Sequence, residues 1–543
     1  METLRTLLFG ILLLIAYLLW NAWQTDYSHP AQANQSSVIS ETPPKMEGLA
    51  NLTTRTTAMS LPSTTQSGLA QSRQWIRFKT DTLSGVIDTR GGHLVHLALL
   101  HYPQSGDAKK NPPFNLLDQE TRYYVAQTGL RNLQEDNTQS GEWLYTSPTL
   151  QYNLLPGQQE LQIDLRWQDR NRIVTKRFLL KRGDYQVRVQ YHLRNRGTTP
   201  WQTQLYNQLQ RKGPMQSGGG LLSLPAYVGG AISTQTKPYE KIPFDKMGAH
   251  SLSAVTQPNW IALVEPYFLS AWVPNTTQAF QAYSAVQGEL YTLGMLGPMR
   301  TIMPGQQHMM TTKLYAGPAV IEQLKAAATH LELNVDYGML WFISTGLFWL
   351  LKQFHQFIGN WGWAIVFVTI LLKLAFYGLS AKSFRSMAAM RKLQPRLQSL
   401  KERYGDDRQK IAQATMELYR SERVSPLGGC LPMLIQIPVF IALYWVLLES
   451  VELRQAPFML WIRDLSAKDP FYVLPILMGI SMFLQQKLSP SPTDPMQAKV
   501  MLLLPVLFTV IFLNFPAGLV LYWLVNNTLS ILQQWWMMRA TAS

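Results

Sequence analysis

The sequence is poor in the residue types on which covalent cross-links and most enzyme motifs depend. Cys430 is its single cysteine among 543 residues, so an intrachain disulfide and a CxxC metal site are both excluded. A GxxxxGK[ST] phosphate loop, an HExxH pair and a GxSxG elbow are also missing. The nine histidines are dispersed, without metal-ligand spacing. We therefore expect no enzyme activity and neither a metal nor another cofactor.

Long apolar runs are confined to the two ends of the chain. The first run, Thr6–Trp23, follows Arg5 and ends in tryptophans, which favours a retained transmembrane anchor over residues 1–23 rather than a cleaved signal peptide. Five more spans are predicted at about 361–379, 427–448, 471–488, 500–513 and 518–536. The prediction is a six-span helical bundle, an anchor plus a five-helix core over 359–537.

The basic residues between these runs set the expected orientation. The loop 381–424 holds 11 Lys/Arg, whereas the loop 451–469 holds 3. Loops rich in Lys and Arg face the cytoplasm, so we expect 381–424, both termini and the short tail 538–543 inside. If residues 24–333 lie outside and the loop 381–424 lies in the cytoplasm, only one membrane crossing fits between them, and that is the span 361–379. The segment 334–358 therefore does not cross the membrane. We predict that it lies on the outer surface as an amphipathic helix.

The region outside the membrane divides into two parts. Residues 24–72 are rich in Gln, Ser, Thr and Pro, which indicates a flexible linker. From Trp75 onward apolar and polar residues alternate, for example at Leu161, Ile163 and Leu165. This period of two predicts an antiparallel β-sandwich over residues 73–333.

The loop 381–424 reads as a basic helical hairpin. Its 11 basic and 5 acidic residues fall on two helical stretches, Phe384–Tyr404 and Arg408–Arg423, joined by a turn at 405–407. Either the charge only sets topology, or the hairpin is a docking arm for nascent chains, ribosomal RNA or anionic lipid headgroups. The basic residues of this docking hypothesis are Arg385, Arg391, Lys392, Arg396, Lys401, Arg403, Arg408 and Lys410. No other nucleic-acid binding is expected, because the remaining positive charge is scattered.

Several polar residues lie inside the predicted spans. Lys373 is the most unusual. It lies about two-thirds of the way along its predicted span toward the cytoplasm, and a lysine near mid-bilayer costs on the order of 2.5–3.5 kcal/mol on insertion scales. Thr369, Lys373 and Tyr377 are four residues apart, which places them on one helix face. Snorkelling of Lys373 and hydrogen bonding between helices are the simpler explanations. The set that we expect to line a water-accessible groove is Lys373, Thr369, Tyr377, Gln436, Tyr444, Tyr522, Trp523, Asn526 and Ser530.

Four stretches resemble the YidC/Oxa/Alb insertase family in its proteobacterial form. They read SPLGGCLPMLIQIPVFIALYW at 425–445, SVELRQAPFMLWIRDLSAKDP at 450–470, FPAGLVLYW at 515–523 and TDTLSGVIDTRGG at 80–92. The resemblance implies a membrane protein insertase and folding chaperone of the bacterial inner membrane, with residues 24–360 periplasmic and a β-supersandwich fold in its large domain. It also implies nascent membrane proteins as cargo, action alone or with the Sec translocon, contact with membrane lipids, and a hydrophilic groove with a cation in the second span.

Three departures from the family pattern bear on function. Lys373 stands where the family usually has arginine, so the charge is kept but bidentate pairing with a carboxylate is lost. Gly378 replaces a common proline. The tail after Met538 lacks a basic cluster, which leaves the hairpin as the expected, weak ribosome contact. A small-solute transporter and a membrane-anchored assembly scaffold are the alternative functions, although we find no internal repeat of the kind that transporters show.

Overall fold

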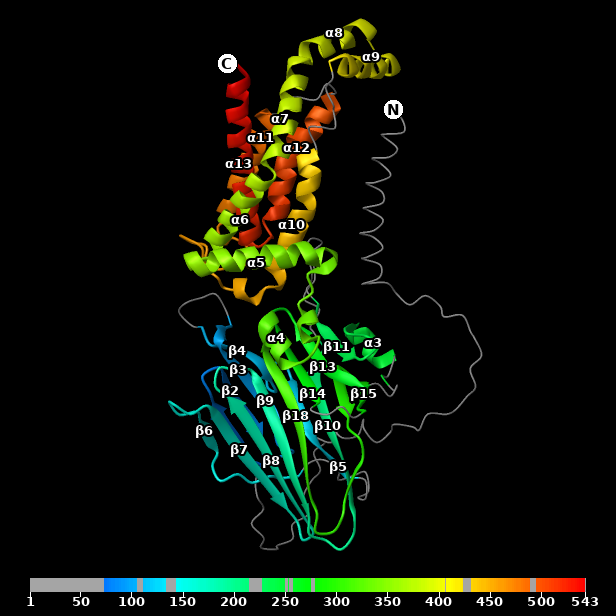
Figure 1. Ribbon diagram of the computed structural model, residues 1–543, viewed down its shortest axis with the longest axis vertical. Coiled ribbons are helices and arrows are strands. Elements are labelled where there is room, and N and C mark those ends of the chain that lie inside the picture. The colour runs from blue at the N-terminus through cyan, green and yellow to red at the C-terminus, as the bar shows by residue number, and fades with distance from the viewer. Residues whose placement is uncertain are drawn as a thin grey trace, which may run out of the picture. The chain divides into compact units, whose positions relative to one another are not determined.

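The computed structural model describes residues 73–104, 111–132, 143–213, 227–249, 252, 257–274, 279–405, 407–422, 431–488 and 495–542. The predicted anchor 1–23 and linker 24–72 lie outside the described residues. Strands occupy the chain from Trp75 to Pro318, and in the described part of the chain every helix except the short α3 follows them (Figure 1).

The strands form two sheets. The first sheet has the order β15 (Gln281–Gln287), β16 (Leu290–Leu296), β10 (Trp201–Lys212), β5 (Tyr124–Asn132), β4 (Pro113–Asp118), β3 (His93–Pro103), β2 (Leu83–Asp88), β1 (Trp75–Lys79) and β6 (Gln151–Asn153), with β17 (Arg300–Ile302) paired to β10. The second has the order β12 (Glu240–Ile242), β11 (Gly229–Thr234), β13 (Pro258–Glu265), β14 (Phe268–Pro274), β18 (Gln307–Pro318), β9 (Gln186–Asn195), β8 (Arg172–Lys181) and β7 (Glu160–Gln168).

The pairing is antiparallel, as the alternation predicts, except that β1 and β6 run parallel. On β9 the inward residues Val187, Val189, Tyr191 and Leu193 are all buried. Each such side chain contributes roughly 1.5–3 kcal/mol when it leaves water. The apolar residues that alternate along the strands therefore lie in one hydrophobic core that the two sheets share.

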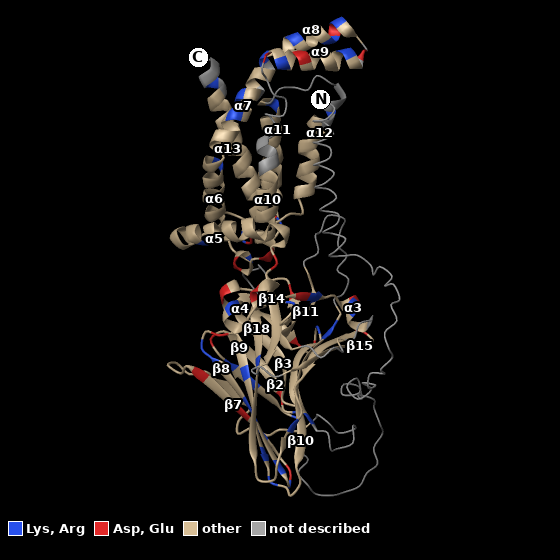
Figure 2. Cartoon of the chain, turned by 45° about the vertical axis from the view of Figure 1, so that its right-hand side comes forward, with Lys and Arg blue, Asp and Glu red and all other residues tan. Residues whose placement is uncertain are grey.

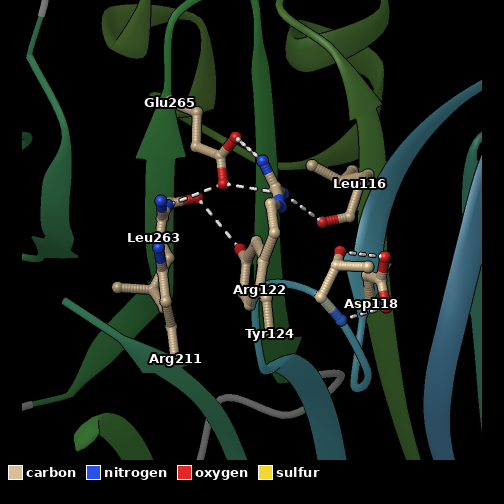
Figure 3. Close-up of polar contacts among 8 residues, drawn as sticks. Leu116, Asp118, Arg122, Tyr124, Arg211, Leu263 and Glu265 are labelled. Carbon is tan, nitrogen blue, oxygen red and sulfur yellow. Dashed lines mark hydrogen bonds and ion pairs between the residues drawn. The ribbon is translucent and has the colours of Figure 1, made fainter. Parts of the chain in front are cut away.

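A buried ion cluster joins the two sheets (Figure 3). Glu265, at the end of β13, accepts hydrogen bonds from Arg211 on β10 (Nη1 to Oε1, 2.6 Å) and from both terminal nitrogens of Arg122 (3.1 Å each). Arg122, in the turn between β4 and β5, also donates to the carbonyl of Leu116 at 2.8 Å. Because Glu265 belongs to the second sheet and both arginines to the first, the cluster holds the sheets in register.

A buried lysine makes a further contact between the sheets. Lys176 on β8 is fully buried, and its Nζ donates to the carbonyls of Gly91, Gly92 and Thr128 at 3.1, 2.6 and 2.7 Å. Burial lowers the pKa of Lys176 well below its ordinary value. Gly91 and Gly92 have φ of 71° and 62°, in a region that residues with a Cβ rarely adopt. The glycine pair thus allows the turn that presents two carbonyls to Lys176.

The described helices fall into two short ones and a longer set. The two short ones are α3 (Phe244–Ala249) and α4 (Ile321–Ala327), and 3-10 turns lie at Leu331–Asn334, Gly338–Leu340 and Val451–Leu453. The longer ones are α5 (Trp341–Ile358), α6 (Trp361–Ala375), α7 (Tyr377–Lys392), α8 (Gln394–Tyr404), α9 (Arg408–Ser421), α10 (Leu431–Glu449), α11 (Val473–Leu488), α12 (Pro495–Phe512) and α13 (Ala517–Ala542).

Helix α6 is shorter than the predicted span 361–379. It ends at Ala375, and the chain bends by 63° into α7. Gly378 and Ser380 follow the bend at once, and sharp bends concentrate at such Gly/Ser pairs. Within the described ranges no single helix combines the length and hydropathy needed to cross a membrane. The bent pair Trp361–Ala375 and Tyr377–Met390 meets both requirements together.

Helix α5 covers most of the segment predicted to be amphipathic, and in both views it lies crosswise to α6 and α10 (Figures 1 and 2). Leu347 and Leu351 are buried on one side. On the other, Trp341, Phe342 and Trp349 are 64%, 60% and 59% exposed. The helix therefore presents a large unburied apolar face, as an interfacial helix does.

The segment between α10 and α11 is bonded to the β-sandwich. Arg454 donates to the carbonyls of Pro103 and Gln104 at 2.8 and 3.3 Å. Its guanidinium lies over the rings of Phe114 and Phe268, 5.5 and 5.3 Å from their centroids. Arg454 thus combines two charged hydrogen bonds with two cation–π contacts.

Candidate functional site

Lys373 lies near the end of α6 and reaches across to α13. Its Nζ donates to the hydroxyl oxygen of Ser530 at 2.7 Å. Ser530 in turn donates to the backbone carbonyl of Asn526 at 2.8 Å. Because the serine proton is used in that bond, its oxygen is left to accept from the ammonium. The structure therefore joins two residues that the sequence placed on different predicted spans.

A small cavity, here called the first hollow, opens beside this contact. Its volume is about 30 Å³, enough for about two water molecules. Its lining consists of Thr369, Leu372, Lys373, Phe376, Leu379, Ser380, Gln436, Val439, Tyr522 and Asn526. Five of the predicted groove residues thus meet here, from α6, α10 and α13.

The polar side chains that line the first hollow differ in their hydrogen-bond partners. The hydroxyl of Tyr522 is hydrogen-bonded to the side chain of Gln436. Thr369 donates to the carbonyl of Ile365 in its own helix at 2.6 Å, a local bond that leaves only the oxygen lone pairs toward the hollow. The arrangement brings a cation and several hydrogen-bond acceptors together in one hollow.

A larger cavity, the second hollow, lies on the other side of Lys373. Its volume is about 370 Å³, and its lining consists of Ile370, Lys373, Leu374, Tyr377, Leu529, Gln533 and Trp536. Tyr377 therefore lines a different hollow from Thr369, although the two are eight residues apart on the predicted helix face. The bend after Ala375 breaks that face. Lys373 alone lines both hollows.

Tyr444 and Trp523 line neither hollow, contrary to the predicted groove. Tyr444 packs on Phe515 with 5.6 Å between ring centroids, and Trp523 meets Phe440 edge-on at 4.6 Å. Phe512 completes this aromatic cluster, 5.5 Å from Trp523. Aromatic side chains stabilise a fold most where their rings pack against each other. In Tyr444 and Trp523 this packing outweighs the tendency of the hydroxyl or the indole N–H to face a polar groove.

Two polar residues of α13 face α11 instead of the hollows. Asn527 donates to the hydroxyl of Ser481 at 3.1 Å, and Gln534 donates to the carbonyl of Leu488 at 3.0 Å. These bonds hold two helices together, which is the simpler role foreseen for polar residues in spans. Sequence reasoning missed Gln533 and Trp536, because neither belongs to the row spaced by four that begins at Tyr522.

The predicted basic hairpin differs from the structure in its first stretch, because Phe384–Tyr404 is divided at Leu393 between α7 and α8. The second stretch is α9, and Figure 2 shows Lys and Arg spread along all three helices. Asp407 caps α9 by accepting from the backbone N–H of Lys410 at 3.1 Å. Exposed side chains among the predicted docking residues are those of Arg385, Lys392, Arg396, Lys401, Arg403 and Lys410. The side chains of Arg391 and Arg408 lie outside the described residues.

Two of these cations are engaged in ion pairs, Arg396 with Glu422 at 2.5 Å and Lys410 with Asp407 at 3.1 Å. Exposed ion pairs of this kind contribute about 0–1 kcal/mol, so they leave the hairpin available to other anions. Among the described residues no group of three or more His, Cys, Asp or Glu could hold a metal ion.

Comparison with known proteins gives consistent matches along the chain. The family model for the YidC periplasmic domain matches residues 75–350, and that for the 60Kd inner membrane protein matches residues 353–543. A membrane protein insertase YidC of Legionella pneumophila (strain Corby) is 46% identical over 542 residues, which cover 99% of this chain and 97% of the relative. The insertase YidC of Nitrosococcus oceani is 45% identical over 558 residues, covering 99% of each.

Among solved structures, an active YidC insertase with its first transmembrane domain resolved matches 85% of this chain and 92% of the other at 17% identity. Its TM-score of 0.38 is too low to support a conclusion about shared geometry. The relatives are named as insertases and not as enzymes, in line with the absence of catalytic motifs. On the two family models and on 45–46% identity across almost the entire length, the chain belongs to the YidC family of membrane protein insertases.

Proposed function

We propose that the protein inserts nascent membrane proteins into the bacterial inner membrane and assists their folding. In this proposal six spans cross the membrane with both termini in the cytoplasm, and residues 24–360 are periplasmic. The protein acts alone or beside the Sec translocon and contacts ribosomes weakly through the α8–α9 hairpin. Family membership and the exposed basic residues of the hairpin support these assignments.

The observation that carries the proposal is the position of Lys373 at the first hollow. Four helices, α6, α7, α10 and α13, bring polar groups to it, and the lining itself contains no Asp or Glu. A cargo carboxylate 4 Å from the ammonium would gain about 4 kcal/mol at an effective dielectric near 20. That gain is similar to the roughly 2.5–3.5 kcal/mol needed to bring an acid to mid-bilayer. The site lowers a barrier without trapping what it binds.

The size of the first hollow constrains the mechanism. At about 30 Å³ it admits water-sized groups and no peptide segment, so α6, α10 and α13 must separate when cargo enters. Cargo docks on the hairpin, its polar part enters beside Lys373, and its apolar segment then moves into lipid. Burial of the apolar segment drives the last step. The membrane potential adds about 2.3 kcal/mol per acidic charge per 100 mV.

The test places a photo-crosslinking residue at Asn526 and adds ribosomes stalled while making a short membrane protein. A matched probe at Asn527, which faces α11, is the control. We expect crosslinks to the nascent segment from Asn526 and few from Asn527. If the folded, membrane-inserted protein gives none from Asn526, the transporter and scaffold functions become the better explanations.

A further inference from the structure

The second hollow holds two hydrogen-bond donors and a long apolar wall. Lys373 contributes its ammonium, which has three N–H groups and can donate on both sides of the helix. Gln533 contributes an enclosed Nε2 that has no hydrogen-bond partner in the described part of the chain. A buried donor left without an acceptor costs about 1–3 kcal/mol. The pair therefore fits a ligand that carries oxygen acceptors.

The charge around this hollow favours an anion. No acidic residue occurs in α6, α7 or α13, the helices that line it. Basic residues continue along the same helices toward their far ends, at Lys382 and Arg385 on α7 and at Arg539 on α13. Basic pockets between helices on the cytoplasmic side of a membrane bind anionic lipid headgroups.

The apolar lining and its position identify the rest of the ligand. Ile370, Leu374, Leu529 and Trp536 form most of the wall, and the volume of about 370 Å³ is within the range of small-molecule sites. Trp536 is also 58% exposed. Tryptophans gather where membrane meets water, so the open side of the hollow faces the headgroup level and the hydrocarbon below it.

We propose that the second hollow binds an anionic phospholipid of the inner leaflet. Its phosphate oxygens accept hydrogen bonds from the Lys373 ammonium and the Gln533 amide, and one acyl chain packs along Leu374, Leu529 and Trp536. The lipid occupies this site in the absence of cargo, so the inference goes beyond cargo insertion, and it rests on the proposed orientation with α7 and the end of α13 toward the cytoplasm.

The test is native mass spectrometry of the full chain in detergent, titrated with phosphatidylglycerol or phosphatidylcholine of the same acyl chains. We expect phosphatidylglycerol to bind more tightly by about tenfold, because both lipids carry the same phosphate but phosphatidylcholine adds a quaternary ammonium that the nearby Lys373 ammonium repels. Gln533→Leu, which removes a donor to the phosphate, should weaken both lipids severalfold, and Trp536→Ala, which removes part of the acyl-chain wall, should also weaken both. Asn526→Leu is the matched control, because Asn526 lines the first hollow and not the second.

Three results would overturn the assignment. Equal binding of the two lipids shows that the positive charge of Lys373 does not select an anionic lipid. If Asn526→Leu weakens lipid binding and Gln533→Leu does not, the phosphate binds in the first hollow and not in the second. A photoreactive residue at Trp536 gives a readout that does not depend on the substitutions being tolerated. Capture of phosphatidylglycerol supports the proposal, whereas capture of cargo alone makes the hollow an exit path for nascent chains.

Discussion

Replacing Glu265 with glutamine tests whether the buried ion cluster holds the two sheets together. Glu265 is 7% exposed and accepts three hydrogen bonds from Arg211 and Arg122. Glutamine keeps the size but removes the negative charge and turns an NH₂ group toward a guanidinium. The buried Arg211 charge then remains without its counterion, and so does the charge of the partly exposed Arg122. Breaking a buried pair in this way costs about 3–5 kcal/mol, a factor of at least ~100 in the unfolding equilibrium.

A comparison variant separates the charge from the contact. The side chain of Arg122 is 33% exposed, and Glu265 keeps Arg211 when Arg122 becomes methionine. We expect Arg122→Met to cost about 1–2 kcal/mol, the range of one or two partly solvated charged hydrogen bonds. The structure thus predicts which of the two variants loses more stability, as well as the size of each loss.

Hydrogen exchange of the full chain in detergent measures both effects. The slowest amides of β10 and β13 report opening of the sandwich. In Glu265→Gln their exchange should accelerate by roughly 100-fold or more, and in Arg122→Met by roughly tenfold. Equal effects in the two variants, or a change confined to the turn that holds Arg122, would refute the idea that the cluster couples the sheets.

Three further predictions concern the helical part and its junction with the sandwich. Lys373→Arg should support insertion of a cargo with an acidic terminus, whereas Lys373→Met should slow it by tenfold or more in reconstituted vesicles and leave a neutral cargo unaffected. Arg454→Ala should raise hydrogen exchange at residues 450–456 by about tenfold, and Arg454→Lys should restore little of it, since the forked contact to two carbonyls is lost. Burial, with Glu322 nearby, raises the pKa of Glu452. The protonated form is favoured in the folded state, so this stability is present at acidic pH and is lost as pH rises through the raised pKa. Exchange at residues 451–453, corrected for intrinsic rates, should therefore be slower at pH 5 than at pH 8, and Glu452→Gln should abolish the difference.

The β-sandwich was predictable because burial on β9 follows the alternation of its sequence. The same rule exposes an oversight at Lys176, which stands at an inward position of β8 between Val174 and Phe178. A lysine in that register signals a buried polar contact, but its acceptors on the Gly91–Gly92 turn come from a strand pair far away in sequence. Partners of that kind cannot be identified from one strand alone.

The candidate site was predicted in part. Spacing by four places Tyr522, Asn526 and Ser530 on one face of the continuous helix α13. Tyr522 and Asn526 line the first hollow with Lys373, whereas Ser530 lines neither hollow and accepts the hydrogen bond from Lys373. Spacing by four did not place Tyr377 beside Thr369, because the spacing assumes an unbroken helix and α6 ends before Tyr377. The count of six spans and the orientation remain predictions that rest on charge and hydropathy.

The single ammonium that separates the two hollows couples them thermodynamically. An anion held on one side of Lys373 changes the affinity for an anion on the other by some factor, and the second changes the affinity for the first by that same factor. Two negative charges sharing one cation repel each other, so the coupling is antagonistic. Under the two proposed binding modes, occupancy of either hollow by an acidic group promotes release from its neighbour, so that Lys373 exchanges a lipid phosphate for a cargo carboxylate.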